Sequence, residues 1–149
     1  MIKKTSFLIL IFSIVVLALS AVSAVESQNI ENNTVAIGGV DFTIPDNFHE
    51  NVTLRIENQT KNIGSVIYIL DSRAYENEKN FMTIFVSNYN NLDGSKDIVN
   101  QIGGDTIQIN SEKGFLHEGN QFYSFTFEKD GKIVALSSDN KDLFREFVI

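Results

Sequence analysis

Short runs of alternating apolar and polar residues, separated by glycine-containing pairs, constrain the fold of this chain more than any other feature. The clearest pair is Asp130-Gly131, which lies between the runs "QFYSFTFEK" and "KIVALS". Gly38-Gly39 separates two further runs, "VAI" and "VDFTI". Glycine and, less readily, aspartate adopt the positive φ angles that a two-residue hairpin turn requires. The pattern therefore predicts a chain built mainly from antiparallel hairpins.

Two other runs are apolar at almost every position. They are "SVIYIL", residues 65–70, and "FMTIFVS", residues 81–87. A strand that is apolar on both faces is covered on both faces, as in the middle of a buried sheet. We therefore expect both runs to form central strands in which four residues are deeply buried: Ile67, Ile69, Ile84 and Val86.

Two segments show helical periodicity instead. Residues 95–103, "SKDIVNQIG", carry one apolar stripe, with Ser95 as the expected N-cap and Gly103 as the stop. Near the C-terminus, Asp139 is expected to cap a second helix whose apolar side carries Leu143, Phe144, Phe147 and Val148. Helices this short need a sheet to pack on. The predicted fold class is α+β, a mainly antiparallel twisted sheet with two short amphipathic helices packed on it, similar to an α-β-α sandwich.

Residues 1–24 have the order of a secretory signal. Lys3 and Lys4 form a short basic region, an apolar core follows from Phe7 to Leu19, and small residues lead up to Ala24. The alternative is an uncleaved N-terminal membrane anchor, because an apolar helix of about 20 residues can span a bilayer. In both cases the basic pair keeps the N-terminus inside and the rest of the chain outside. We therefore expect a secreted protein or, alternatively, a membrane-anchored one that faces outward.

The remaining chain divides into a flexible polar leader, residues 25–34, and a single domain, residues 35–149. Without residues 1–24 the chain keeps ten of its 12 basic residues and all 19 acidic residues, which gives a net charge of −9. So acidic a domain repels phosphate backbones and anionic membrane surfaces. We expect a protein or another envelope component as partner, no nucleic acid, and membrane contact only through an uncleaved N-terminal segment. The oligomeric state stays open.

The motifs of known catalytic and metal sites are absent from the sequence. There is no cysteine, and the two histidines, His49 and His117, lie far from any zinc-binding spacing. The segment around Gly94 lacks the first and last carboxylates of a calcium loop. No phosphate loop or G-x-S-x-G motif is present. We therefore expect no catalytic residue, no cofactor and no metal, although carboxylate pairs leave no trace in sequence spacing.

Four positions remain as candidate surface sites. Asn32, Asn51 and Asn58 each begin an N-x-[ST] sequon, which is a candidate N-glycosylation site in an exported chain. Phe122 begins the aromatic run "FYSFTF" and faces away from the alternating aromatic residues that follow it, with polar neighbours on its own face. Most aromatic strand residues belong to a core, so Phe122 is the candidate surface contact of this run.

Three stretches carry a resemblance to known proteins: "GGVDFTIPDNF", "GFLHEGNQFYSFTFEKDGKIVALSS" and the amphipathic C-terminal segment. Together with the N-terminal signal, they resemble small secreted proteins of unknown function from methanogenic archaea. No enzymatic role is attached to that group. The stretch "FTIPDNF" is also similar to a turn in the PsbP/Mog1-type α-β-α sandwich, although Asn47 stands where glycine is common. That fold would not by itself imply a function.

These observations predict a secreted or cell-surface domain without catalytic activity, which serves as an interaction or binding module of the cell envelope. Two alternatives stay open. One is a small extracellular hydrolase or an accessory subunit of one, which a carboxylate cluster or a His–Ser pair in a deep pocket would favour. The other is a domain that binds a small ligand in a groove between sheet and helix.

Overall fold

The computed structural model describes residues 34–64, 66–89 and 95–149, without the side chains of residues 95–97. The strands are β1 (Thr34–Ile37), β2 (Val40–Thr43), β3 (His49–Glu50), β4 (Ile56–Ile63), β5 (Val66–Glu76), β6 (Phe81–Tyr89), β7 (Asp105–Ile109), β8 (Glu112–Glu118), β9 (Tyr123–Lys129) and β10 (Lys132–Ser138). The helices are α2 (Ser95–Ile102), α3 (Phe144–Phe147) and two 3₁₀ turns, η1 (Val52–Leu54) and η2 (Lys141–Leu143).

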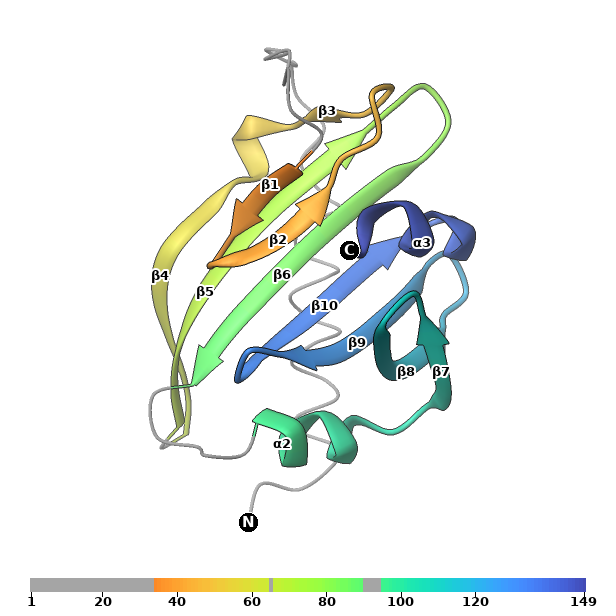
Figure 1. Ribbon diagram of the computed structural model, residues 1–149. Coiled ribbons are helices and arrows are strands. Elements are labelled where there is room, and N and C mark those ends of the chain that lie inside the picture. Colours follow the sequence, from red (N-terminus) through yellow and green to blue (C-terminus); the bar gives the residue numbers. More distant parts are fainter. Residues whose placement is uncertain (1–33, 65, 90–94) are drawn as a thin grey trace.

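One antiparallel sheet of eight strands forms the body of the molecule (Figure 1). Its strand order is β3-β5-β6-β10-β9-β8-β7, and β4 pairs with the same edge of β5 as β3 does. The hairpin β1–β2 forms a separate two-stranded sheet that lies in front of β5 and β6 in Figure 1. Neighbouring strands are mostly consecutive in sequence and joined by short turns, as is usual in antiparallel sheets.

The two glycine-containing turns are confirmed. Gly38 and Gly39 form a two-residue loop with φ angles of 55° and 74°, between the paired ends of β1 and β2. Asp130 and Gly131, with φ angles of 52° and 74°, join β9 to β10 in the same way. Both pairs have the left-handed geometry that matches the twist of a hairpin.

The predicted α+β fold class is wrong. Strands make up 61 % and helices 14 % of the described residues, and among these helices only α2 reaches seven residues or more. The expected C-terminal helix is one 3₁₀ turn, η2, followed by one turn of α-helix, α3. It ends early because Val148 leaves the helix and forms a β-bridge with Phe42 of β2. Its cap is Asn140, whose side chain accepts a hydrogen bond from the Asp142 amide at 3.1 Å.

The expected apolar side of this C-terminal segment is nevertheless correct, since Leu143, Phe144, Phe147 and Val148 are all buried. Asp139, the predicted cap, instead accepts a hydrogen bond from the backbone N–H of Phe81 at 3.2 Å. The other predicted helix is confirmed as α2, which ends before Gly103 at a φ of 75°. The expected N-cap side chain of Ser95 lies outside the described residues.

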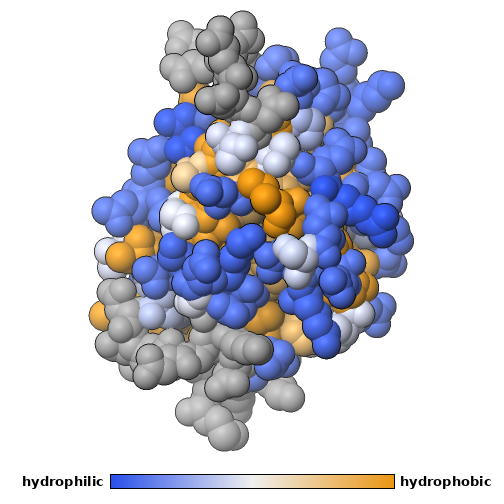
Figure 2. Space-filling view, viewed as in Figure 1, coloured by the Kyte–Doolittle hydropathy of each residue, from blue (hydrophilic) through white to orange (hydrophobic). Residues whose placement is uncertain are grey.

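Two cores lie on opposite faces of the sheet. The hairpin face carries β1–β2 and the C-terminal segment η2–α3, which pack on residues of β6, β9 and β10 such as Ile84, Phe125 and Leu136. The α2 face carries α2, whose Val99 and Ile102 belong to a core with Phe85 and Ile133. Consecutive strand residues point to opposite faces, so Ile84 and Phe85 of β6 each enter a different core. Figure 2 shows that hydrophilic residues cover most of the hairpin side, with hydrophobic residues near its centre.

The four predicted burial positions divide into two pairs. Ile84 and Val86 are buried, at 0 % and 1 % exposure, so β6 is confirmed as a central strand. The prediction is wrong for Ile67, which is 46 % exposed, and for Ile69, which is half-buried. Both residues lie near the start of β5, which extends well beyond the hairpin β1–β2 in Figure 1. Here β5 has a covered α2 face but an open hairpin face.

This difference gives a direct test of the two-core arrangement. Ile84→Ala should lower the free energy of unfolding by about 2–5 kcal/mol, because it leaves a cavity in a packed core. The matched control Ile67→Ala removes the same atoms from an exposed site and should cost less than about 1 kcal/mol. Urea unfolding of both variants measures the two losses, and equal losses would contradict the assignment of the faces.

Candidate functional site

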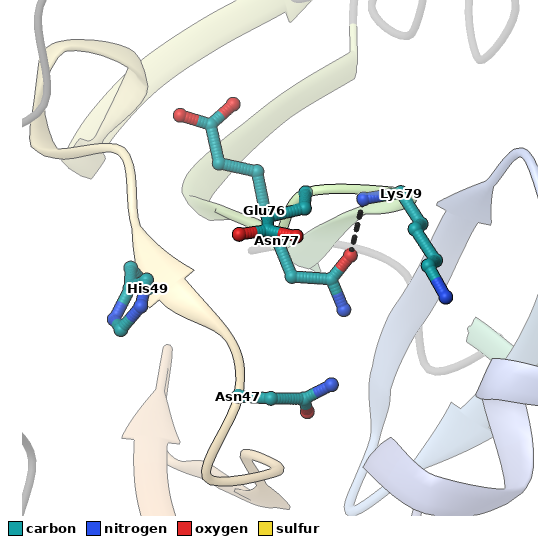
Figure 3. A pocket seen from close by; sticks show the side chains of 6 residues that line it. Asn47, His49, Glu76, Asn77 and Lys79 are labelled. Carbon is teal, nitrogen blue, oxygen red and sulfur yellow. Dashed lines mark hydrogen bonds between the residues drawn. The ribbon is translucent and has the colours of Figure 1, made fainter.

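A pocket of about 530 Å³ lies at one end of the sheet, between β3 and the turn that joins β5 to β6 (Figure 3). Its volume falls in the range of small-molecule sites in proteins. All the residues that line it are polar or charged: Asn47, His49, Glu76, Asn77, Glu78 and Lys79. The pocket therefore suits a hydrophilic group.

Two local turns position these side chains. The backbone N–H of Phe48 donates to the carbonyl of Pro45 at 2.9 Å, and this turn leads from β2 into β3. The side-chain oxygen of Asn77 accepts hydrogen bonds from the backbone amides of Lys79 and Asn80, at 2.9 and 2.8 Å, and so closes the β5–β6 turn (Figure 3). An asparagine at the first position of a turn commonly forms such bonds.

The pairing of β3 with β5 brings His49 and Glu76 together. They are directly opposite each other in the ladder, so their side chains lie on the same face. The His49 side chain is exposed to solvent. The Glu76 carboxylate accepts one long hydrogen bond, 3.5 Å, from the side-chain amide of Asn51. The lining thus offers the imidazole of His49, two carboxylates, two side-chain amides and the amine of Lys79. The carboxylates can bind a cationic group, and the other groups can bind a polar one.

A network of charged side chains fixes β3 behind the pocket. Glu50 follows His49 and points to the opposite face, where it is 5 % exposed. Its two carboxylate oxygens accept bonds from the Nε and Nη2 atoms of Arg55, both at 2.7 Å. Arg73 of β5 lies 3.8 Å from Glu50, and Glu57 contacts both arginines at 3.4 and 3.5 Å. This bidentate pairing joins β3, the start of β4 and β5 into one unit.

The network also affects two ionisable groups. The hydrogen bond to Glu50 and the neighbouring carboxylate charges raise the pKa of Arg55, so this guanidinium stays charged. Tyr75 pairs with Glu50 in the ladder and is completely buried, and no described residue forms a hydrogen bond with its hydroxyl. Burial, and secondly the charge of Glu50, raise the pKa of Tyr75 to about 12. Tyr75 is therefore neutral at physiological pH and acts as a large core side chain.

Replacing Glu50 by glutamine tests whether this network holds β3. Glu50→Gln should cost about 1–3 kcal/mol of stability, since it leaves two arginines without their buried carboxylate. Glu57→Gln makes the same chemical change on the same two arginines, but the Glu57 side chain is 58 % exposed. That control should cost less than about 1 kcal/mol. Thermal or urea unfolding measures the stability that each variant loses. A loss for Glu57→Gln as large as that for Glu50→Gln would show that the burial of Glu50 gives it no special structural role.

The second histidine belongs to a different part of the sheet. His117 of β8 pairs with Ser124 of β9, which pairs with Ser137 of β10, which in turn pairs with Thr83 of β6. These residues form a polar row on the α2 face, so the fold does not bring His117 and His49 together. The Nε2 atom of His117 and the hydroxyl of Ser137 are buried, and neither has a hydrogen-bond partner among the described residues.

A histidine beside a serine is a pattern of nucleophilic catalysis, but the pattern requires a hydrogen bond between them and a third group that orients the histidine. In the described part of the chain, His117 has no hydrogen bond to Ser124 or to a carboxylate. A side-chain carbon placed on Gly104 would lie 3.0 Å from Nε2. The imidazole therefore packs against the loop that follows α2. Sequence reasoning missed this row because spacing along the chain does not reveal strand register.

The predicted surface sites have different environments. Asn51 is buried and Asn58 is exposed, while Asn32 lies outside the described residues. Phe122 is half-buried and packs against the core of the α2 face. Its use as a surface contact stays a prediction.

Within residues 34–64, 66–89 and 98–149, no three His, Asp or Glu side chains come together in a way that could hold a metal ion. Residues 90–94 of the segment around Gly94, which lacks the first and last carboxylates of a calcium loop, lie outside the described residues. None of the helices described for this chain is both long and apolar enough to cross a membrane. Comparison of the chain with protein-family models, with curated proteins and with solved structures gives no match.

Proposed function

We propose that this protein is a secreted or surface-held interaction domain of the cell envelope, without catalytic activity, which binds a basic segment of a protein partner. The observation that carries the proposal is the polar pocket beside His49, in which two carboxylates, Glu76 and Glu78, line a space of about 530 Å³. A lysine or arginine side chain of the partner is the chemical group that such carboxylates bind best.

The charges around the pocket favour a cationic partner. The two arginines between the start of β3 and the end of β5, Arg55 and Arg73, are both paired with Glu50 and Glu57. Lys79 is the one lysine or arginine in the pocket lining. The chain without residues 1–24 carries a net charge of −9, which attracts basic molecules over a longer range.

The location is supported by the sequence of residues 1–24, with its basic, apolar and small-residue blocks in the order of a secretory signal. A domain placed outside the cell in this way can meet envelope proteins. The hydrolase alternative has one observation in its favour, the pairing of His117 with Ser124. We rank it second because the pair lacks a hydrogen bond.

The experiment starts with protein recovered from the culture medium, whose intact mass should correspond to a chain that begins at Val25. A hexa-arginine peptide is then titrated into it at physiological salt, with isothermal calorimetry as the readout. Replacing Glu76 and Glu78 together by glutamine should weaken binding at least about tenfold, which corresponds to 1.4 kcal/mol. The control pair Asp41→Asn and Glu146→Gln removes the same charge from exposed sites elsewhere and should change the affinity less than about twofold.

Equal weakening by the two double variants would show that the peptide responds to overall charge, and would remove the pocket from the proposal. Hydrolysis of p-nitrophenyl acetate that disappears in Ser124→Ala, while folding is retained, would favour the hydrolase instead.

A further inference from the structure

We propose that Asn58 is an N-glycosylation site of the folded protein, and that the fold makes the neighbouring sequon at Asn51 inaccessible. The sequence alone treats the two sequons alike, since both have the form N-x-T and lie seven positions apart. The structure gives their side chains opposite environments. In the cell this modification depends on the proposed export of the chain, whereas the test below does not.

Asn51 is a structural residue. It is 5 % exposed, and its side-chain oxygen accepts hydrogen bonds from the backbone amide of Thr53 at 3.2 Å and from the Thr53 hydroxyl at 2.6 Å. It thereby caps the 3₁₀ turn η1, and its Nδ2 atom donates to Glu76. Transfer of a sugar to this nitrogen would require the side chain to leave its buried position, and that movement would break the cap made by the side-chain oxygen. Both the side-chain amide of Asn51 and the hydroxyl of Thr53, which define the sequon, already form hydrogen bonds.

Asn58 has the opposite character. It is exposed and lies in a β-bulge of β4, where the ladder passes from the pair Ile56–Ser72 to the pair Gln59–Leu70. Its backbone adopts a φ of 49°, and its backbone N–H donates to the side chain of Asp71 at 2.9 Å. The backbone is thus anchored, while no described residue forms a hydrogen bond with the Asn58 side chain. The fold therefore leaves the Nδ2 atom available.

The surroundings of Asn58 also provide room for a saccharide. Thr60, the hydroxyl residue of this sequon, is exposed. Among the strands of the described chain, β4 pairs with β5 alone, so its outer edge carries no strand. A bulge at such an edge interrupts the ladder and turns the chain locally outward. A group attached to Asn58 would project from the sheet edge without displacing a core residue.

The reaction joins the Nδ2 atom of Asn58 to the anomeric carbon of an oligosaccharide. The co-substrate is a lipid-linked oligosaccharide, in which the anomeric carbon is bonded to a phosphate oxygen of the lipid. The new N–C bond forms as the C–O bond to phosphate breaks, the lipid phosphate leaves with the electron pair, and one Nδ2 proton passes to a base. No oxidant or reductant is needed.

The test uses the purified full-length chain, a single-subunit oligosaccharyltransferase and a lipid-linked oligosaccharide. Synthetic peptides that span residues 46–56 and 54–64 serve as unfolded references, and both should be glycosylated. With the folded chain, cleavage after glutamate followed by mass spectrometry should find the sugar on Asn58 and less than about one tenth of that rate on Asn51. Thr60→Ala should abolish modification of Asn58, whereas Thr53→Ala should leave it unchanged.

A folded chain in which Asn51 is modified as fast as Asn58 would overturn the proposal, as would a folded chain whose Asn58 stays unmodified while the peptide is accepted. Circular dichroism before and after the reaction checks that the chain remains folded. Failure of export in the cell would affect the proposed location and leave these results valid.

Discussion

Closure of the hairpin face is the constraint on which the rest of the structure depends. One side of the central strands is sealed by segments from both ends of the described chain, the hairpin β1–β2 and the C-terminal segment η2–α3. They meet at the β-bridge between Phe42 and Val148. Phe147 also contacts the ring of Phe48 edge-on, with centroids 5.1 Å apart. Such aromatic contacts stabilise a core by about 0.5–1.5 kcal/mol each beyond the burial of their surface.

This closure also determines where the candidate site forms. Phe48 is held in the hairpin-face core, and the next residue, His49, is therefore held in the lining of the pocket. Because side chains alternate between the two faces of a strand, Glu50 points away from the pocket and pairs with Arg55. The short strand β3 therefore links the aromatic core, the pocket and the charge network. The partner proposed above would meet a pocket that is already held in shape, so its binding would cost less ordering entropy.

The sequence predicted those parts of the fold that depend on local chemistry. The turns at Gly38-Gly39 and Asp130-Gly131 require positive φ angles, which few residues adopt, and both lie where they were expected. Strand β6 has enough apolar residues on both faces to identify a central strand. Strand β4 escaped prediction because an exposed edge strand such as "IENQTKNI" needs no apolar alternation.

The site depends on information that no local pattern contains. The approach of His49 to Glu76, and that of His117 to Ser124, follows from the register of strands whose pairing is decided by the whole sheet. The sequons at Asn51 and Asn58 are likewise identical as motifs and differ only in burial. Periodicity also could not show that the hairpin β1–β2 stops short of Ile67, because the length of a covering element is a property of the tertiary structure.

Native-state hydrogen exchange tests most directly whether the two ends of the chain close the hairpin face. If they do, removing the hairpin exposes the core, and the amides of β2 should exchange only through the global unfolding that also releases β6 and β10. Their exchange free energies should then agree within about 1 kcal/mol and fall together with added denaturant. Amides of β2 that exchange through local opening, several kcal/mol below those of β6, would show that the sheet is stable without its cover and would contradict this account.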